Sequence, residues 1–572
     1  MGAATIPPVS EWVRARSTGR ERVTISSWPP PQPTTETQSS RPPPATRSPT
    51  GAVAPFPCPA SCAPVSFPAS AAGTNPGAAR WPSPGVRQRS PSLSTPYPDP
   101  MDNIRTLVIL GASGDLTARL LLPGLGSLLD LQPEREITIV GSARDDFPGP
   151  LGPDDDVRAG TWEETVAKAF ASVGATGPAV ERAQRETHWV SCDVTEAADL
   201  EKLLGDVVGP VCLYFALAPA ITKKACAALA ELDSLPEDLY LALEKPVGTD
   251  LASARALNAQ VGQLVDEQHT FRVDHFLGMP GVLDIVGLRF ANRLFEPLWD
   301  RRHVESIEIV FDETLALEGR GEFYDSTGAA RDMLQSHLLQ VMALTMMDPP
   351  SRFDAVEVPA NTAHILRATR LWDEESTMHA AEHPGITPVV RGRYTAGTTG
   401  GHDVPDYAHE KDVDPRRETE TFVQVTLEVD TWRWNGVPVT LRSAKAIGDP
   451  AQHIRVTFRR PPHGYMGWPH PTAPNVLTIG FEEEHVQLAA NVGSPFDSRG
   501  MSRLTLSSAV PEPGLTAYGS VMRWILDGDP TFTVRADASE EGWRIIDLIQ
   551  NAYDTCAPLQ EYPAGSAGPR FK

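Results

Sequence analysis

The run TLVILGASGDL at residues 106–116 sets the fold class of the N-terminal part of the chain. Its apolar first half, 106–110, predicts a buried strand, and the stretch that follows to Leu131 has the apolar spacing of a helix. Glycine between a strand and a helix lets the backbone approach a pyrophosphate, which the N-terminus of the helix stabilises. The predicted nucleotide-binding turn comprises Gly111, Ala112, Ser113, Gly114, Asp115 and Leu116. Because this run is shorter than the three-glycine fingerprint, an ordinary strand-to-helix turn stays open as an alternative.

Three further apolar strands are expected at residues 137–141, 211–215 and 239–243, with helical stretches between them. Continuous apolar strands that alternate with helices are typical of a parallel sheet covered on both faces. The sequence therefore predicts an α/β fold here, a doubly wound dinucleotide-binding domain over residues 101–274.

The pattern changes after about residue 290, where apolar and polar residues alternate in short segments. These segments are 422–429, 437–441, 453–458, 476–479 and 486–490. Such alternation is typical of an antiparallel sheet with one exposed face. Helical spacing is confined to 329–347, 518–526 and 540–552. We expect residues 275–572 to form an α+β domain built on a large antiparallel sheet, which binds substrate and dimerises.

Residues 1–100 differ in composition from the rest, with 22 of the 55 prolines, nine arginines and four acidic residues. A segment without apolar periodicity cannot offset the entropy of ordering, so we expect a disordered leader. Met101 opens the first patterned segment, so an upstream reading frame that is not native protein is favoured over an organellar transit peptide. The net charge of −23 for the whole chain leaves −28 for residues 101–572, which argues against nucleic acid as a partner.

Two other classes are excluded by composition. No run of 18 apolar residues exists, so no membrane span is expected. The six cysteines lack His or Cys partners at metal-binding spacing, so no structural metal is expected, and their isolation in apolar stretches indicates a reducing, cytoplasmic location.

The residues after the strand at 137–141 bear on the choice of cofactor. An acidic side chain at this place binds the ribose hydroxyl of NAD, whereas an arginine pairs with the 2′-phosphate of NADP. Arg144 therefore favours NADP. Asp145 and Asp146 follow it and would repel that phosphate, so NAD stays possible.

Two polar constellations lie where ligands bind. Lys245 follows the strand at 239–243, and the carboxyl end of a parallel strand borders the ligand crevice; Pro246 fixes its turn, plausibly as a cis peptide. Asp274 and His275 adjoin in a loop, and His337 falls on the helix at 329–347. An acid–histidine pair can remove a hydroxyl proton while a hydride leaves the same carbon. A surface lysine and a core histidine are the alternatives.

Taken together, these motifs resemble the glucose-6-phosphate dehydrogenase family. The resemblance covers residues 103–570 and rests on 111–116, 244–250, 272–278, 288–292, 331–337, 432–438, 441–445 and 562–569. It implies oxidation of a hexose 6-phosphate, glucose 6-phosphate, at C1 to the 1,5-lactone with hydride transfer to NADP, the first reaction of the pentose phosphate pathway. It also implies a homodimer or a dimer of dimers.

Roles for single residues follow from the resemblance. It implies that His337 is the general base, that Asp274 orients it, and that Lys245 contacts both substrate and nicotinamide. The remaining implied substrate contacts are His275, Glu313, Asp332 and Lys445, and the remaining implied cofactor contacts are Asp193 and Val194.

The chain departs from the family at the expected sugar-phosphate site. Phe276 stands where the family usually has tyrosine, and Met279, Pro450 and Leu120 stand where it has cations. The exact sugar therefore stays open: either another cation replaces them, with Arg393 as the candidate, or the substrate lacks the 6-phosphate. A non-catalytic nucleotide-binding paralogue with a regulatory role is the alternative from another class.

Overall fold

The structure is a computed structural model, and the residues it describes all belong to one compact unit. They are 104–150, 155, 157–205, 207, 209–317, 319–373, 375, 380–463, 472–481, 485–493, 500–509 and 514–570. The expected leader, residues 1–100, lies outside this set. Among the helices of the described residues, none is both long and apolar enough to cross a membrane.

The N-terminal part contains the predicted parallel sheet, with six strands in the order β3-β2-β1-β4-β5-β6. The strands are β1 (Thr106–Leu110), β2 (Thr138–Ala143), β3 (His188–Ser191), β4 (Val211–Phe215), β5 (Leu239–Leu243) and β6 (Thr270–Arg272). Every residue of β1, β4 and β5 is buried, as expected for strands covered on both faces. The doubly wound fold is confirmed.

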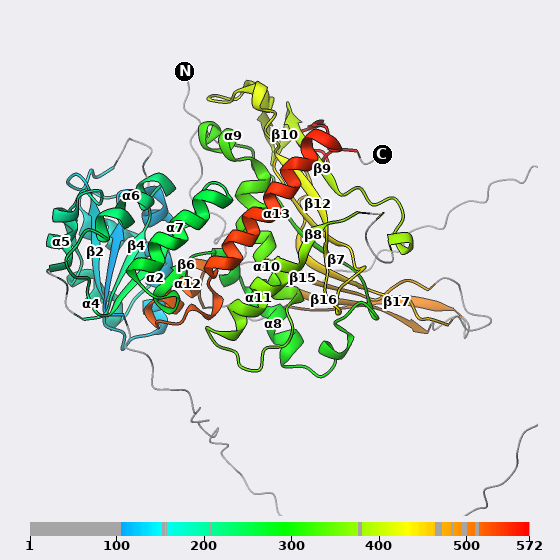
Figure 1. The fold of residues 1–572 in the computed structure, drawn as a ribbon, viewed down its shortest axis with the longest axis horizontal. Coiled ribbons are helices and arrows are strands. Elements are labelled where there is room, and N and C mark those ends of the chain that lie inside the picture. The colour runs from blue at the N-terminus through cyan, green and yellow to red at the C-terminus, as the bar shows by residue number, and fades with distance from the viewer. Residues whose placement is uncertain are drawn as a thin grey trace, which may run out of the picture. The chain divides into compact units, whose positions relative to one another are not determined.

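Helices connect these strands (Figure 1). They are η1 (Thr117–Leu121), α2 (Leu122–Leu131), α3 (Trp162–Ser172), α4 (Pro178–Arg185), α5 (Ala197–Gly205), α6 (Pro219–Leu229) and α7 (Leu251–Leu264). The start of α7 is fixed by a capping box, in which Asp250 accepts from the Ser253 backbone N–H at 2.7 Å and Ser253 Oγ accepts from that of Asp250 at 3.1 Å. This cap sets the loop that carries Lys245.

The C-terminal part contains a ten-stranded sheet in the order β17-β16-β15-β14-β7-β13-β12-β9-β18, with β8 beside β12. The strands are β7 (Val304–Asp312), β8 (Thr369–Leu371), β9 (Val389–Thr395), β12 (Phe422–Val429), β13 (Val439–Ala444), β14 (Gln452–Phe458), β15 (Val476–Gly480), β16 (His485–Gly493), β17 (Met501–Ala509) and β18 (Gln560–Pro563). A separate hairpin joins β10 (Gly397–Thr399) to β11 (His402–Val404). The sheet is mostly antiparallel, as predicted, but β7–β13 and β9–β18 pair in parallel.

Helices pack against this sheet around an apolar core. They are α8 (Pro280–Phe290), α9 (Gly321–Ala329), η5 (Ala330–Leu338), α10 (Leu339–Met346), α11 (Glu357–Ala368) and α13 (Ala536–Thr555). In Figure 1, α10, α11 and α13 lie together beside the sheet. The expected single helix over 329–347 is therefore two segments, the π-helical η5 and then α10.

The last helices also contact the first sheet. In α12 (Ala517–Leu526), five residues belong to the apolar cluster that covers β1 and α2: Tyr518, Val521, Met522, Ile525 and Leu526. The Ile104 backbone N–H donates to the Leu526 carbonyl at 3.1 Å, and Trp543 Nε1 donates to the Val247 carbonyl at 2.8 Å. These contacts hold α12 against the first sheet and α13 against the loop that carries Lys245.

Candidate active site

The predicted nucleotide-binding turn follows β1. Gly111 has φ +84°, and a Cβ there would lie 2.4 Å from the Ala216 carbonyl oxygen, so a side chain at this position is excluded. The backbone N–H groups of Gly111 and Ala112 both donate to the Ser142 carbonyl, at 2.8 and 2.9 Å. The ends of β1, β2 and β4 are thus drawn together at the edge where a parallel sheet binds ligands.

Asp115 has a role in this turn that the sequence did not reveal. Its carboxylate pairs with the buried guanidinium of Arg158 at 2.6 Å, and Arg158 Nε donates to the Ser113 carbonyl at 3.0 Å. Asp155 is the second carboxylate partner of Arg158, at 2.6 Å. Arg158 therefore fixes the turn and neutralises a carboxylate that would otherwise repel a pyrophosphate.

A cavity of about 460 Å³ lies beside the turn. Five predicted cofactor residues line it: Gly111, Ser113, Arg144, Asp193 and Val194. Two polar residues that were not predicted, Thr195 and Lys224, line it too. The predicted Ala112, Gly114 and Asp115 are outside this lining, and Leu116 lines the neighbouring cavity instead.

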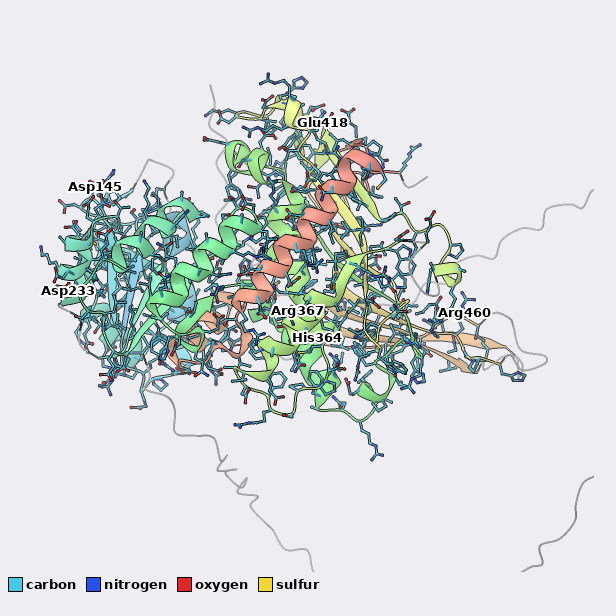
Figure 2. The ribbon with its side chains drawn as sticks, viewed as in Figure 1. Asp145, Asp233, His364, Arg367, Glu418 and Arg460 are labelled. Atoms are coloured by element: carbon cyan, nitrogen blue, oxygen red, sulfur yellow. The ribbon has the colours of Figure 1, made fainter. Side chains whose placement is uncertain are left out.

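The nucleotide cavity is lined by charges of both signs: two cations, Arg144 and Lys224, and three carboxylates, Asp145, Asp146 and Asp193. The Arg144 side chain is 74% exposed, with Nε 3.7 Å from the Asp145 carboxylate, so its guanidinium is accessible to a ligand. Figure 2 labels Asp145 on the outer part of the parallel-sheet domain. Hydrogen bonds from Thr195 lower the pKa of Asp193, which keeps that carboxylate ionised.

A second cavity, of about 500 Å³, holds the expected substrate residues. Lys245, His275, Glu313, Asp332, His337 and Lys445 all line it. Leu217 lines both this cavity and the nucleotide cavity, so the two adjoin. These six residues come from five separate stretches of the chain, and the fold brings them together.

His337 and Asp274 form a buried pair. His337 Nδ1 lies 2.5 Å from Asp274 Oδ1, and the Phe276 backbone N–H donates to the same carboxylate oxygen at 3.1 Å. Burial lowers the pKa of His337 against the opposing effect of Asp274. Burial alone would raise the pKa of Asp274, but the neighbouring imidazole lowers it overall. The arrangement is a neutral imidazole held by a carboxylate, which suits a general base.

The same two residues and His275 each place one potential metal ligand atom within 4.8 Å of the others. His337 Nδ1 and Asp274 Oδ1, however, are already hydrogen-bonded to each other. The histidine rings are 4.7 Å apart between centroids. Burial, and then the charge of His337, lower the pKa of His275 to about 3, so His275 is neutral near pH 7.

Two ion pairs complete the polar lining. The peptide bond from Lys245 to Pro246 is cis, as the sequence suggested, and Lys245 Nζ lies 3.1 Å from Asp332 Oδ1. Lys445 Nζ donates to Glu313 Oε2 at 2.6 Å. Burial would raise the pKa of Asp332, but Lys245 lowers it. Each predicted lysine is therefore held by a predicted carboxylate.

Glu244, which precedes Lys245, is a carboxylate of the cavity lining that sequence reasoning missed as a site residue. Glu244 Oε1 accepts from the Tyr214 hydroxyl at 2.5 Å and from the Tyr518 hydroxyl at 3.3 Å. Burial raises the pKa of Glu244 to about 7. The Tyr518 ring stacks on His275, with centroids 5.2 Å apart. Nothing local in the sequence links Tyr518 to this site, because it lies on the distant helix α12.

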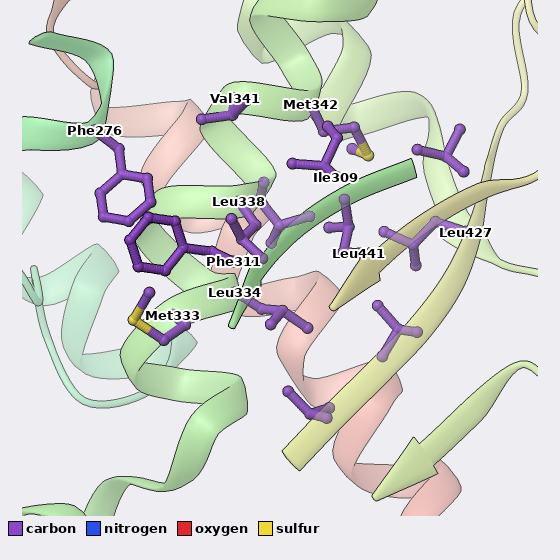
Figure 3. Close-up of a cluster of buried hydrophobic side chains, with 14 of the residues drawn as sticks. Phe276, Ile309, Phe311, Met333, Leu334, Leu338, Val341, Met342, Leu427 and Leu441 are labelled. Carbon is purple, nitrogen blue, oxygen red and sulfur yellow. The ribbon is translucent and has the colours of Figure 1, made fainter. Parts of the chain in front are cut away.

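The departures from the family pattern make one part of the cavity apolar. Phe276 stacks on His337 with centroids 4.1 Å apart and meets Phe311 at 4.8 Å, as Figure 3 shows for the two phenylalanines. Leu120 also lines the cavity and is 45% exposed. Met279 is buried outside the lining. Arg393 pairs with Glu561 at 3.3 Å and does not line the cavity, so it is not the replacement cation.

A nucleotide cavity at the carboxyl edge of a parallel sheet, adjoining a buried carboxylate–imidazole pair, defines a dehydrogenase that uses a nicotinamide dinucleotide. Two family models match the chain. "Glucose-6-phosphate dehydrogenase, NAD binding domain" matches residues 108–283, and "Glucose-6-phosphate dehydrogenase, C-terminal domain" matches residues 286–572. The chain belongs to the glucose-6-phosphate dehydrogenase family.

The chain is similar in sequence to individual relatives over most of its length. Glucose-6-phosphate 1-dehydrogenase of Gluconobacter oxydans (strain 621H) is 34% identical over 477 residues, which is 81% of this chain and 94% of the relative. The enzyme of the same name from Mycolicibacterium smegmatis is 33% identical, over 83% of this chain and 96% of the relative.

Solved structures show the same similarity. The crystal structure of glucose-6-phosphate 1-dehydrogenase from Mycobacterium avium has a TM-score of 0.67 and 31% identity, over 82% of this chain and 96% of that one. A glucose-6-phosphate dehydrogenase in complex with its substrate glucose 6-phosphate has a TM-score of 0.70 and 25% identity, over 82% and 96%.

Proposed function

We propose that this chain oxidises glucose 6-phosphate at C1 to the 1,5-lactone, with NADP as the cofactor. One observation carries the proposal: His337, hydrogen-bonded to Asp274, lines a cavity that shares Leu217 with the nucleotide cavity. A base beside a nucleotide site is what removal of a hydroxyl proton coupled to hydride loss requires. Membership of the family supports glucose 6-phosphate as the substrate.

His337 acts as the base in this proposal. Its Nδ1–H donates to Asp274, which leaves Nε2 to accept the proton of the C1 hydroxyl. Asp274 fixes the tautomer and stabilises the imidazolium that forms. Lys245, Asp332, Glu313 and Lys445 would hold the sugar hydroxyls, and His275 would face the sugar phosphate as a neutral hydrogen-bonding group.

NADP, when bound, supplies the nicotinamide ring that accepts the hydride. The residues present fit this group. Gly111 and Ser113 would lie against the pyrophosphate, and Arg144 would pair with the 2′-phosphate. Lys224 adds a second cation to the same cavity. NAD would lose the contact to Arg144 and keep the others.

Initial rates test the proposal directly. Glucose 6-phosphate, glucose and other hexoses are compared, each with NADP and with NAD. We expect glucose 6-phosphate with NADP to give the largest kcat/KM. Equal rates with glucose would favour the alternative of a substrate without the phosphate. No turnover with any sugar, together with tight nucleotide binding, would favour the non-catalytic paralogue.

We further propose a cytoplasmic homodimer that pairs through the large sheet. Apolar side chains are exposed on its edge strand β17 and on the neighbouring β16, with Leu504 of β17 at 40%, Leu506 of β17 at 54% and Val492 of β16 at 37%. Exposed apolar surface of this kind favours contact with another protein surface. The molar mass in solution, measured by light scattering with Leu506→Glu as the test variant, checks the dimer: a mass of one chain for the wild type would contradict it.

A further inference from the structure

The substrate cavity presents a problem of charge. Its lining includes the carboxylates Glu313 and Asp332, and Asp274 lies directly behind His337. A sugar phosphate brings up to two further negative charges into this region. Such a ligand needs a cation that is not already neutralised. The resemblance places Phe276, Met279, Pro450 and Leu120 at positions where the family usually has a tyrosine and three cations.

Five basic side chains line the cavity; three of them are already bound to a carboxylate, and a fourth is uncharged. Lys245 pairs with Asp332, and Lys445 pairs with Glu313. His337 is hydrogen-bonded to Asp274, and His275 is neutral near pH 7. The fifth is Arg320, an exposed residue for which no ion pair exists within the described part of the chain.

The backbone around Arg320 is well fixed. Its N–H donates to the Leu317 carbonyl at 3.1 Å, and its carbonyl accepts from the Tyr324 N–H at 3.0 Å as α9 begins. A Cβ on the next residue, Gly321, would lie 2.1 Å from the Lys411 carbonyl oxygen, so only glycine allows this close contact. The Arg320 backbone is therefore held by hydrogen bonds on both sides at the start of α9, and its side chain is exposed.

We propose that Arg320 recognises the phosphate of the sugar substrate and is a specificity-determining residue of this chain. The inference rests on the proposed function. A guanidinium binds a phosphate with two parallel hydrogen bonds, which an ammonium cannot reproduce. Because Arg320 has no carboxylate partner within the described residues, no ion pair there needs to break when the phosphate binds. The neutral His275 and the apolar Phe276 would then line the sugar without adding charge.

The test is a substrate comparison in the full-length enzyme. Loss of one charge-assisted bidentate contact in Arg320→Ala is expected to raise KM for glucose 6-phosphate by about 10- to 100-fold. The kcat for glucose 6-phosphate and the kcat/KM for glucose are expected to stay within about threefold of wild type. Arg320→Lys is expected to recover part of the loss, because it keeps the charge but not the paired hydrogen bonds.

Arg393→Ala is the matched control, since Arg393 is also an arginine of the second domain but lies outside the cavity lining. Arg393→Ala is expected to leave the KM for glucose 6-phosphate and the kcat/KM for glucose unchanged. An unchanged KM for glucose 6-phosphate in Arg320→Ala would overturn the inference, as would equal losses for glucose 6-phosphate and glucose, which indicate a structural role.

A calorimetric measurement separates this inference from the proposed function. Glucose 6-phosphate and inorganic phosphate are titrated into wild type and into Arg320→Ala. If wild type shows no turnover of glucose 6-phosphate, the proposed function fails, and the inference survives only if Arg320→Ala weakens the binding of both ligands. If wild type turns over glucose 6-phosphate but both proteins bind it equally, the inference alone fails.

Discussion

Two groups of side chains in the substrate cavity differ in how their polar atoms are satisfied. In the group that is proposed to carry the reaction, His337 is bound to Asp274 and Lys245 is bound to Asp332. In the group that is proposed to face the phosphate, Phe276 is apolar and the exposed Arg320 has no ion pair among the described residues. Proton transfer requires a base of one protonation state in one place, which few residue types can supply. A phosphate can be bound by an arginine from any nearby element. The comparison teaches that the group proposed to carry the reaction tolerates little change, whereas the group proposed to bind the phosphate tolerates replacement.

The strongest test of the proposed reaction is His337→Asn, which removes the proposed base. A positioned base contributes about 10²- to 10⁴-fold to turnover, so kcat is expected to fall by that factor. The dissociation constant of NADP is expected to stay unchanged, because His337 does not line the nucleotide cavity. His364→Asn is the control, an exposed histidine on α11 that Figure 2 labels. Near-normal turnover in His337→Asn with tight NADP binding would remove the base from the proposal.

Arg144→Ala asks whether the nucleotide phosphate is also recognised by an exposed cation. The KM for NADP is expected to rise by about 10- to 100-fold, since one bidentate charge-assisted contact is lost. The KM for NAD is expected to change by less than about threefold, because NAD lacks the 2′-phosphate. Arg185→Ala, an exposed arginine on α4, is the control. Equal losses for both cofactors would show that Arg144 has a structural role.

Glu244→Gln probes the carboxylate of the cavity lining that accepts from Tyr214 and Tyr518. Burial raises the pKa of Glu244 from its ordinary value of 4.5 to about 7. Protonated Glu244 therefore stabilises the fold below pH 4.5, and this contribution is lost as the pH rises to about 7. Glutamine cannot ionise and still accepts from Tyr214 and Tyr518. The melting temperature of the variant relative to wild type is expected to increase between pH 5 and 8, by on the order of 3 °C. A difference that does not depend on pH would contradict this.

The double change Phe276→Tyr with Met279→Lys restores the usual family residues at these two positions. If Arg320 already binds the phosphate, the added hydroxyl and cation are expected to raise kcat/KM for glucose 6-phosphate by less than about threefold. Steady-state rates for glucose 6-phosphate and glucose measure this. An increase of an order of magnitude, selective for glucose 6-phosphate, would show that the wild-type cavity holds the phosphate poorly.

The fold was predictable where one residue pattern has one interpretation. The strands β1, β4 and β5 have the bounds expected from their apolar runs, because every residue in them is buried. The short strands β3 and β6 were missed, since four and three residues carry too little pattern. The parallel pairing of β7 with β13 could not be foreseen, because alternation does not reveal the partner of a strand.

The candidate site was predictable where motifs carry the chemistry. His337, Asp274 and Lys245 were named from local patterns and Asp332 from the family resemblance, and the structure brings them together. Arg158, Arg320 and Tyr518 were not, because each is a common residue type in an unremarkable stretch whose importance comes from long-range contacts. The family resemblance is confirmed, whereas the individual roles of the site residues stay predictions.

The packing of α12 against the first domain bears on how the protein is made. The apolar face of α2, which includes Leu128 and Leu129, is covered by Tyr518 and Met522 from almost 400 residues later in the chain. A ribosome adding about 5 to 20 residues per second needs roughly 20 to 80 s to cross that distance. During this interval the nascent first domain exposes an apolar surface that chaperones recognise. A fragment ending before residue 517 is therefore expected to bind an apolar fluorescent dye more strongly than the full chain does.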